Sequence, residues 1–176
     1  MKRATLAACL FAVASGGIVY AQTPSATGGP MLSQEERDDI AIRVRAGDPC
    51  ANCDLFQIDL SYQNVAGRDF SGSRIRQSNF SVAIADGARF RGANLSLANL
   101  FGMRAGRADF TDANLEGATL VGGHFGGARF DGAVLNGANL SGAELAEARG
   151  LTQEQLNTAC GDATTTLPAG MTAPSC

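Results

Sequence analysis

Residues 108–120 read ADFTDANLEGATL, and this stretch decides the fold. Its large apolar residues Phe110, Leu115 and Leu120 are five positions apart, and an Ala stands two positions before each of them. The same period continues through nineteen apolar positions over residues 55–145. A helix advances about 100° per residue and a strand repeats every two residues, so neither element keeps such a period on one side. The pattern predicts a chain that turns a corner every five residues and coils around its own axis.

The stretch resembles the consensus of the pentapeptide-repeat family, Ala-(Asp/Asn)-(Leu/Phe)-x-x, and the nineteen repeats cover about 95 of the 176 residues. The resemblance implies a right-handed, four-sided β-helix with twenty residues per coil. An independent feature agrees with this number, because Phe70, Phe90, Phe110 and Phe130 recur every twenty residues. The predicted fold class is an all-β solenoid, a right-handed quadrilateral β-helix of pentapeptide repeats with short helical caps at both ends.

The caps are predicted from the sequences on either side of the repeats. A solenoid exposes an apolar end at each terminus, and such ends need atypical segments to cover them. Ser33 and Glu36 form a capping-box pattern that opens a short helix, and Gly47 stands just past its end. Thr152 and Gln155 repeat the capping-box pattern after the last repeat.

The N-terminus has the features of a secretory signal. Lys2 and Arg3 precede an apolar stretch over residues 4–19, and small residues precede a predicted cleavage after Ala21. A lipid anchor on Cys9 is an alternative, although few residues precede this cysteine. We therefore expect an exported bacterial protein, periplasmic or extracellular.

Four cysteines remain after cleavage, and an even number in an exported chain suggests disulfides. Two of the three pairings would join opposite ends of the shaft, whereas a disulfide holds its Cα atoms within about 7 Å. The remaining pairing joins Cys50 to Cys53 and Cys160 to Cys176. A redox-active Cys50-x-x-Cys53 is a remote alternative, because no βαβ pattern surrounds it and Cys53 stands at an inward position.

These features divide the chain into five segments. They are a signal peptide (1–21), a disordered linker (22–32), an N-terminal capping helix (33–49), a pentapeptide-repeat β-helix (50–150), and a C-terminal capping helix with a disulfide-pinned tail (151–176).

We predict no catalytic, cofactor-binding or metal-binding residues, and no cofactor. No nucleophile has a base and an orienting group at a recognisable spacing. The only histidine, His124, stands one coil from Arg104 and one from Glu144, which indicates a solvated ion-pair column. Two other columns are also interpreted as structural; they are Asp69, Arg89, Asp109 and Arg129, and Asn79, Asn99, Thr119 and Asn139.

The charge argues against direct binding to nucleic acid. Removal of Lys2 and Arg3 leaves twelve basic and seventeen acidic residues, a net charge of −5, whereas nucleic-acid binding usually needs a basic stripe. The family resemblance implies one alternative, a DNA-mimicking protein that binds type II topoisomerases such as gyrase and protects them from quinolones. The export signal, the arginines of the shaft, its short length and the C-terminal helix argue against it.

A group of apolar residues at outward positions is the candidate partner-binding patch: Tyr62, Val82, Leu97, Phe101 and Val121. A contiguous apolar patch on a flat face indicates a protein contact. The alternative is that the tail, residues 162–176, folds back over it. The predicted function is a non-enzymatic exported scaffold or protein-binding module with an unidentified protein partner and no membrane span. The sequence leaves the oligomeric state open and favours a monomer.

Overall fold

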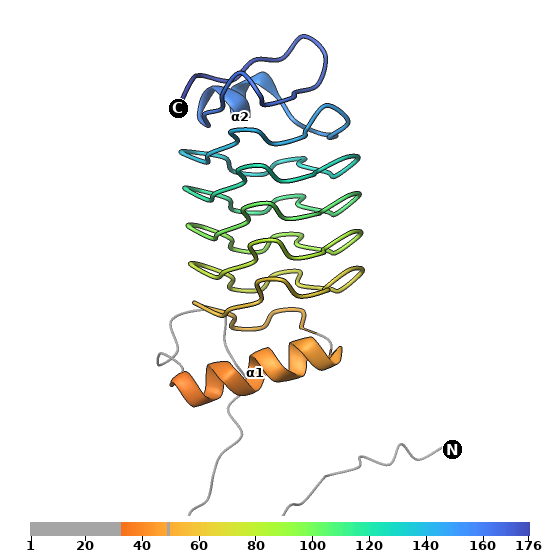
Figure 1. Ribbon diagram of the computed structural model, residues 1–176, viewed down its shortest axis with the longest axis vertical. Coiled ribbons are helices and arrows are strands. Elements are labelled where there is room, and N and C mark those ends of the chain that lie inside the picture. Colours follow the sequence, from red (N-terminus) through yellow and green to blue (C-terminus); the bar gives the residue numbers. More distant parts are fainter. Residues whose placement is uncertain (1–32, 49) are drawn as a thin grey trace, which may run out of the picture.

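The structure is a computed structural model that describes residues 33–48 and 50–176, and its centre is a stack of similar coils (Figure 1). The predicted signal peptide and linker lie outside the described residues. Parallel bridges join each outward residue to the one twenty positions later, from Asp54 with Arg74 to Arg129 with Arg149. Twenty residues hold four repeats, so each coil has four sides. The predicted β-solenoid is confirmed, and its bridges are single because each side is only a few residues long.

Every corner from residue 52 to residue 142 has the same backbone conformation. The residue two places after each buried central residue has a positive φ, and eleven of these nineteen positions are Gly. The carbonyl of the central residue accepts a hydrogen bond from the N–H three residues later, as in Ile58 N to Leu55 O at 3.2 Å. A turn of this kind needs the left-handed backbone conformation at its third residue, and Gly adopts that conformation without a steric penalty.

The interior is filled by the central residues of the repeats, which are all at most 1% exposed over residues 55–145. Phe70, Phe90, Phe110 and Phe130 stack face to face, with ring centroids 5.0–5.2 Å apart. The stack follows from the twenty-residue coil, because equivalent side chains lie above one another at nearly the spacing between strands.

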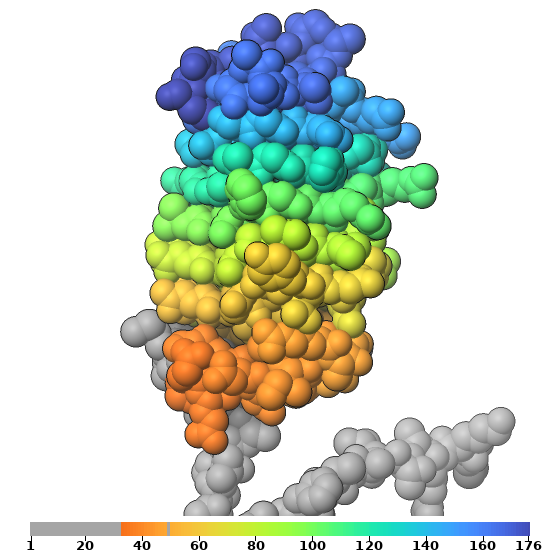
Figure 2. All heavy atoms as spheres, in the orientation of Figure 1, coloured from red at the N-terminus to blue at the C-terminus, as the bar shows by residue number. Residues whose placement is uncertain are grey.

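Helix α1 (Gln34–Ala46) lies across the first coil, and the space-filling view shows its side chains against that end (Figure 2). Its N-terminus has the predicted capping box, with Glu36 N donating to Ser33 Oγ at 3.2 Å and Ser33 N to Glu36 Oε2 at 2.8 Å. Val44 is buried, and its carbonyl accepts a hydrogen bond from Arg68. Arg68 occupies an inward position that is Ala in later coils, and its guanidinium reaches the end of the helix instead of the core.

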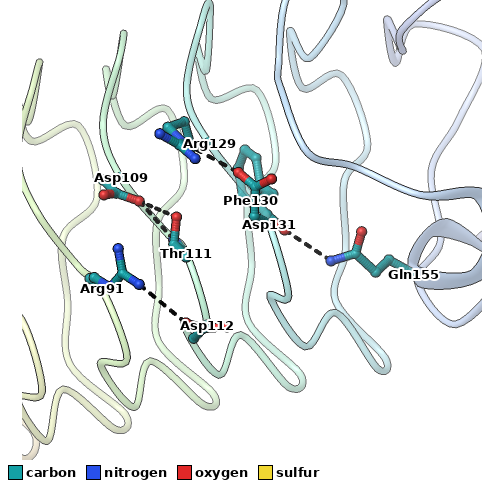
Figure 3. Close-up of polar contacts among 8 residues, drawn as sticks. All are labelled: Arg91, Asp109, Thr111, Asp112, Arg129, Phe130, Asp131 and Gln155. Carbon is teal, nitrogen blue, oxygen red and sulfur yellow. Dashed lines mark hydrogen bonds and ion pairs between the residues drawn. The ribbon is translucent and has the colours of Figure 1, made fainter.

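Helix α2 (Gln153–Asn157) lies at the other end and begins with the predicted capping box of Thr152 and Gln155. The Gln155 amide donates to the carbonyl of Phe130 at 3.0 Å (Figure 3) and to that of Ala133 at 2.7 Å. These bonds satisfy carbonyls of the preceding coil at the open end of the solenoid.

The tail adds an irregular layer to the last coil. Cys160 bridges to Asn139 and Thr166 to Glu144, each in parallel. The Cys160–Cys176 disulfide ties the end of the chain to this layer, with a Cα–Cα distance of 4.9 Å.

The second predicted disulfide lies at the opposite end of the shaft. Cys50 and Cys53 are bonded, with a Cα–Cα distance of 5.2 Å. The structure therefore has both of the predicted pairs.

Asp162 anchors the tail and gives it a predicted pH dependence. Its Oδ1 accepts hydrogen bonds from the hydroxyl and N–H of Thr164 and from the N–H of Gly142. The Thr164 hydroxyl is the largest of the causes that lower the pKa of Asp162 from 3.8 to about 2. A carboxyl whose pKa is lowered by folding stabilises the folded state at pH values above its pKa in the unfolded chain. This stabilisation is lost as the pH falls through the pKa of the folded state and the carboxyl is protonated.

We therefore expect the tail to loosen as the pH falls from 3.8 towards about 2. Amide hydrogen exchange at Gly142 and Thr164, corrected for the intrinsic rate, measures this loosening. In Asp162→Asn the protection should be lower at neutral pH and flat through the same window. An equal pH dependence in that variant would assign the effect to other carboxyls.

Candidate functional site

His124 and Arg104, two charged or titratable residues of the predicted ion-pair column, each pair with an acidic side chain. His124 Nδ1 lies 2.8 Å from Glu144 Oε2, and both side chains are more than half exposed. Arg104 does not join them, because its guanidinium pairs with Asp86 at the next corner. Within residues 33–48 and 50–176, no three His, Cys, Asp or Glu side chains are grouped so that they could hold a metal ion.

The Asn column supports the corners of the coil. Asn99 Oδ1 accepts the N–H of Phe101 at 3.1 Å, and Asn139 Oδ1 accepts that of Ser141 at 2.9 Å. An Asp or Asn side chain can accept from the backbone two residues later, as an Asx turn. The structural interpretation of this column holds. The same contact explains why the repeat consensus has Asp or Asn in its second position, a role that the sequence analysis missed.

The charged column on the Phe side differs from the predicted alternation. Asp69 and Arg89 pair along the column at 3.6 Å. Arg129, however, turns to Asp131 in its own coil, with Nε 3.2 Å from Oδ2, and Asp109 accepts from Thr111 (Figure 3). The outward side chains are long enough to reach a partner at the adjacent corner as well as one in the next coil.

The apolar patch divides between two corners. Tyr62, Val82, Phe101 and Val121 occupy the same corner in four successive coils, and we call this group the apolar corner. Backbone bonds connect its layers, including Val82 N to Phe101 O at 2.7 Å. Leu97 lies at the neighbouring corner, beyond the Asn column, where a Cβ on Gly117 would come within 2.7 Å of its Cδ2. The predicted single patch is therefore a ridge of four residues and one separate leucine.

The apolar corner is open to solvent. Tyr62 is 75% exposed and Phe101 51%, while Val121 is half-buried. The tail does not cover it: Asp162 and Thr165 bond to Gly142, at the same corner in the last coil. The alternative in which residues 162–176 fold back over the patch is wrong.

Two members of this corner hold a backbone conformation that suits Gly. Tyr62 has a φ of 59° and Val82 a φ of 57°, and Leu97 at the other corner also has a φ of 57°. A positive φ costs an ordinary residue roughly 1–2 kcal/mol, and for a β-branched residue it is a true outlier. At equivalent corners in later coils the chain has Gly102 and Gly122. Bulky apolar side chains therefore occupy places where the backbone would be more stable with Gly.

Exposed apolar residues also occur away from this corner. Ile42 on α1 is 61% exposed, and Val134 on another side is 42% exposed. Val134 stands in the outward column after Asn94 and Asn114. A valine in a column of asparagines is the sequence feature that indicates an exposed apolar residue here. In the part of the chain that the structure describes, neither helix is long and apolar enough to cross a bilayer.

Val82→Gly should leave the free energy of unfolding unchanged or raise it by up to about 1 kcal/mol, since it relieves the left-handed strain. Val134→Gly is the matched control, because both valines are 42% exposed but Val134 has no positive φ. This control should lower the free energy of unfolding by about 0.5–1 kcal/mol. Denaturant melts of both variants test the difference, and an equal loss in the two would show that Val82 carries no strain.

The comparisons with known proteins agree with this architecture. Eight copies of the pentapeptide-repeat family model match residues 69–102 and 108–148. A pentapeptide repeat protein from the thylakoid lumen of Arabidopsis thaliana is 30% identical, with a TM-score of 0.57 and coverage of 66% of this chain and 80% of that one. A search of curated proteins found no match.

Two other solved structures are similar at lower TM-scores. Rfr23 from the cyanobacterium Cyanothece 51142 is 22% identical over 74% of this chain and 98% of its own, with a TM-score of 0.33. QnrB1, a plasmid-mediated fluoroquinolone resistance protein, is 26% identical over 64% of this chain and 70% of its own, with a TM-score of 0.30. These scores are too low to support a structural argument. Together with the twenty-residue coil, the repeat matches and the thylakoid-lumen relative show that the chain belongs to the pentapeptide-repeat family.

Proposed function

We propose that this protein is an exported, non-enzymatic scaffold that binds a protein partner through its apolar corner. In this proposal the coil is the right-handed, four-sided form that the family resemblance implies. Helix α1 and the segment from α2 to the C-terminus cap its two ends.

The conformation of the apolar corner carries the proposal. Backbone strain that persists at an exposed position is compensated elsewhere, and such positions concentrate at functional sites. Tyr62 and Val82 contribute little to the core, because they are 75% and 42% exposed. Their replacement by Gly would relieve the backbone without opening a cavity, so a contact outside the chain is the best reason for their presence.

The surroundings of the corner indicate what kind of partner it fits. One of the two sides that meet at this corner presents the neutral residues Asn79, Asn99 and Thr119, while the other presents Ile84, Arg104 and His124. Four coils at the strand spacing give a ridge about 15 Å long. The partner that fits is a protein with an apolar groove of similar length.

Export is supported by the cysteines and by the signal-like N-terminus. Disulfides persist in oxidising compartments and are rare in the cytosol. Within the disulfide Cys50 is 4% exposed and Cys53 is half-buried. The burial of Cys50 argues against the thiol oxidoreductase alternative, in which Cys50 would need an accessible sulfur. The relative from the thylakoid lumen is also a protein of a non-cytosolic compartment.

The partner contact is tested with a photo-crosslinking residue in place of Val121, expressed in the native cell. We expect one discrete cross-linked protein, with a yield that falls at least about tenfold when Phe101→Asp is added, because a charge opposes burial in an apolar groove. Val134→Asp is the matched control, since it adds the same charge at an exposed valine on another side.

The fold should survive both substitutions, since Phe101 is 51% and Val134 42% exposed. A circular dichroism melt checks this. A yield that falls equally in both variants, or the lack of a discrete product, would reject the apolar corner as the binding site.

Export is tested by expressing the full-length chain in a bacterium and measuring its compartment and intact mass. We expect a periplasmic chain that begins at Gln22 and takes up alkylating reagent only after reduction. A cytoplasmic, unprocessed chain with free thiols would contradict the proposal. Inhibition of gyrase supercoiling by the purified protein would then favour the topoisomerase alternative.

A further inference from the structure

A groove of about 740 Å³ lies at another corner of the coil, on the side of the charged column. Its floor includes Gly106, Gly126 and Gly127, where side chains are missing from neighbouring coils. The chain of Arg107 fills part of this space, because a Cβ on Gly127 would lie 3.5 Å from Arg107 Cγ. The hollow is therefore a product of three glycines in adjacent layers.

Three arginines line this groove: Arg107, Arg129 and Arg149. Arg129 and Arg149 bridge in neighbouring coils, so two like charges start about 4.8 Å apart on the backbone. The column below them alternates Asp69, Arg89 and Asp109, and Arg149 breaks that alternation. Like charges directly opposite one another in a sheet are destabilising.

Most of the N–H donors of these three arginines make no hydrogen bond within the described chain. Arg129 uses Nε on Asp131 at 3.2 Å. Within residues 33–48 and 50–176, the side chains of Arg107 and Arg149 make no hydrogen bond or ion pair. A guanidinium presents five donors in a planar fork that matches a carboxylate.

Two acids also line the groove, and they do not neutralise it. Asp86 is already occupied, because it accepts from Arg104 and from the N–H of Gly106 at 2.9 Å. Glu147 lies beside Gly126, with Oε2 3.8 Å from the position of a Cβ there. One open carboxylate therefore faces two arginines without partners and a third that is only partly used.

We propose that this groove binds a short acidic segment of a protein, with carboxylates that pair with Arg107, Arg149 and the remaining donors of Arg129. The three arginines lie in three successive coils, about 10 Å along the shaft, which is enough for the side chains of residues i and i+2 of an extended peptide. A long polyanion is the poorer ligand, because the described chain has seventeen acids and twelve arginines and would repel it beyond the groove. The site is separate from the apolar corner and does not depend on the proposed function.

The test is isothermal titration calorimetry of the full-length chain with a blocked hexapeptide of alternating Glu and Ser at low ionic strength. We expect binding that weakens with added salt, and an affinity at least about tenfold lower in Arg149→Gln and in Arg107→Gln. The matched control is Arg76→Gln, which removes the same charge at a corner outside the groove and should change the affinity less than about twofold. A peptide in which Gln replaces Glu should not bind.

A second readout separates a binding site from an ordinary surface charge. Arg149→Glu restores the alternation with Arg129, so it should raise the melting temperature by about 1–3 °C while it abolishes peptide binding. Mutations that stabilise a fold and remove its activity are typical of residues kept for function.

Three results would overturn the proposal. They are the lack of peptide binding, an equal loss of affinity in Arg76→Gln, and a melting temperature that falls in Arg149→Glu. Tripolyphosphate that binds more tightly than the peptide, with the same dependence on Arg149, would reject the acidic-peptide assignment in favour of a phosphate ligand.

Discussion

The parallel register between each residue and the one twenty positions later is the constraint on which the rest of this structure depends. Backbone hydrogen bonds such as Phe90 N to Asp109 O, 2.7 Å, join each coil to the next. Because the register repeats without a shift, every side chain lies above its equivalent in the coil below. Inside the shaft this stacks the four phenylalanines at centroid distances of 5.0–5.2 Å. Outside, it turns each surface position into a column.

A shaft of this kind has two apolar ends, and segments that do not follow the repeat lie against both of them (Figure 1). At the first end, α1 buries Ala41 and Val44 against the coil, and Arg68 donates to the end of the helix. At the other end, Gln155 satisfies two carbonyls and the tail adds a layer that a disulfide holds in place. Both ends use side chains to bind backbone carbonyls. Arg68 binds those at the end of α1, and Gln155 binds those of the last coil, where an exposed sheet edge would otherwise invite pairing with another chain.

The corners are where the surface is free to vary, because the core needs only their backbone conformation. Gly is the easiest residue at the left-handed position, and the chain departs from it at eight of the nineteen corners, among them those of the exposed Tyr62 and Val82. The groove differs, because Gly106, Gly126 and Gly127 have no side chains there and leave a hollow between arginines. One scaffold thus presents an apolar ridge and a basic groove without altering its interior.

The sequence alone determined the period, the twenty-residue coil, the buried central residues, both helices and the pairing of Cys50–Cys53 and Cys160–Cys176. The core and the helices follow from large burial energies and from short-range capping rules that few alternatives can match. The cysteine pairing follows from the length of the shaft, because a disulfide cannot join its two ends. Only the tertiary structure decided that Leu97 lies apart from Phe101, that Arg104 pairs with Asp86, and where the tail lies. Surface side chains choose among several partners at similar distances, and an exposed ion pair is worth only about 0–1 kcal/mol, so a linear pattern cannot rank the choices.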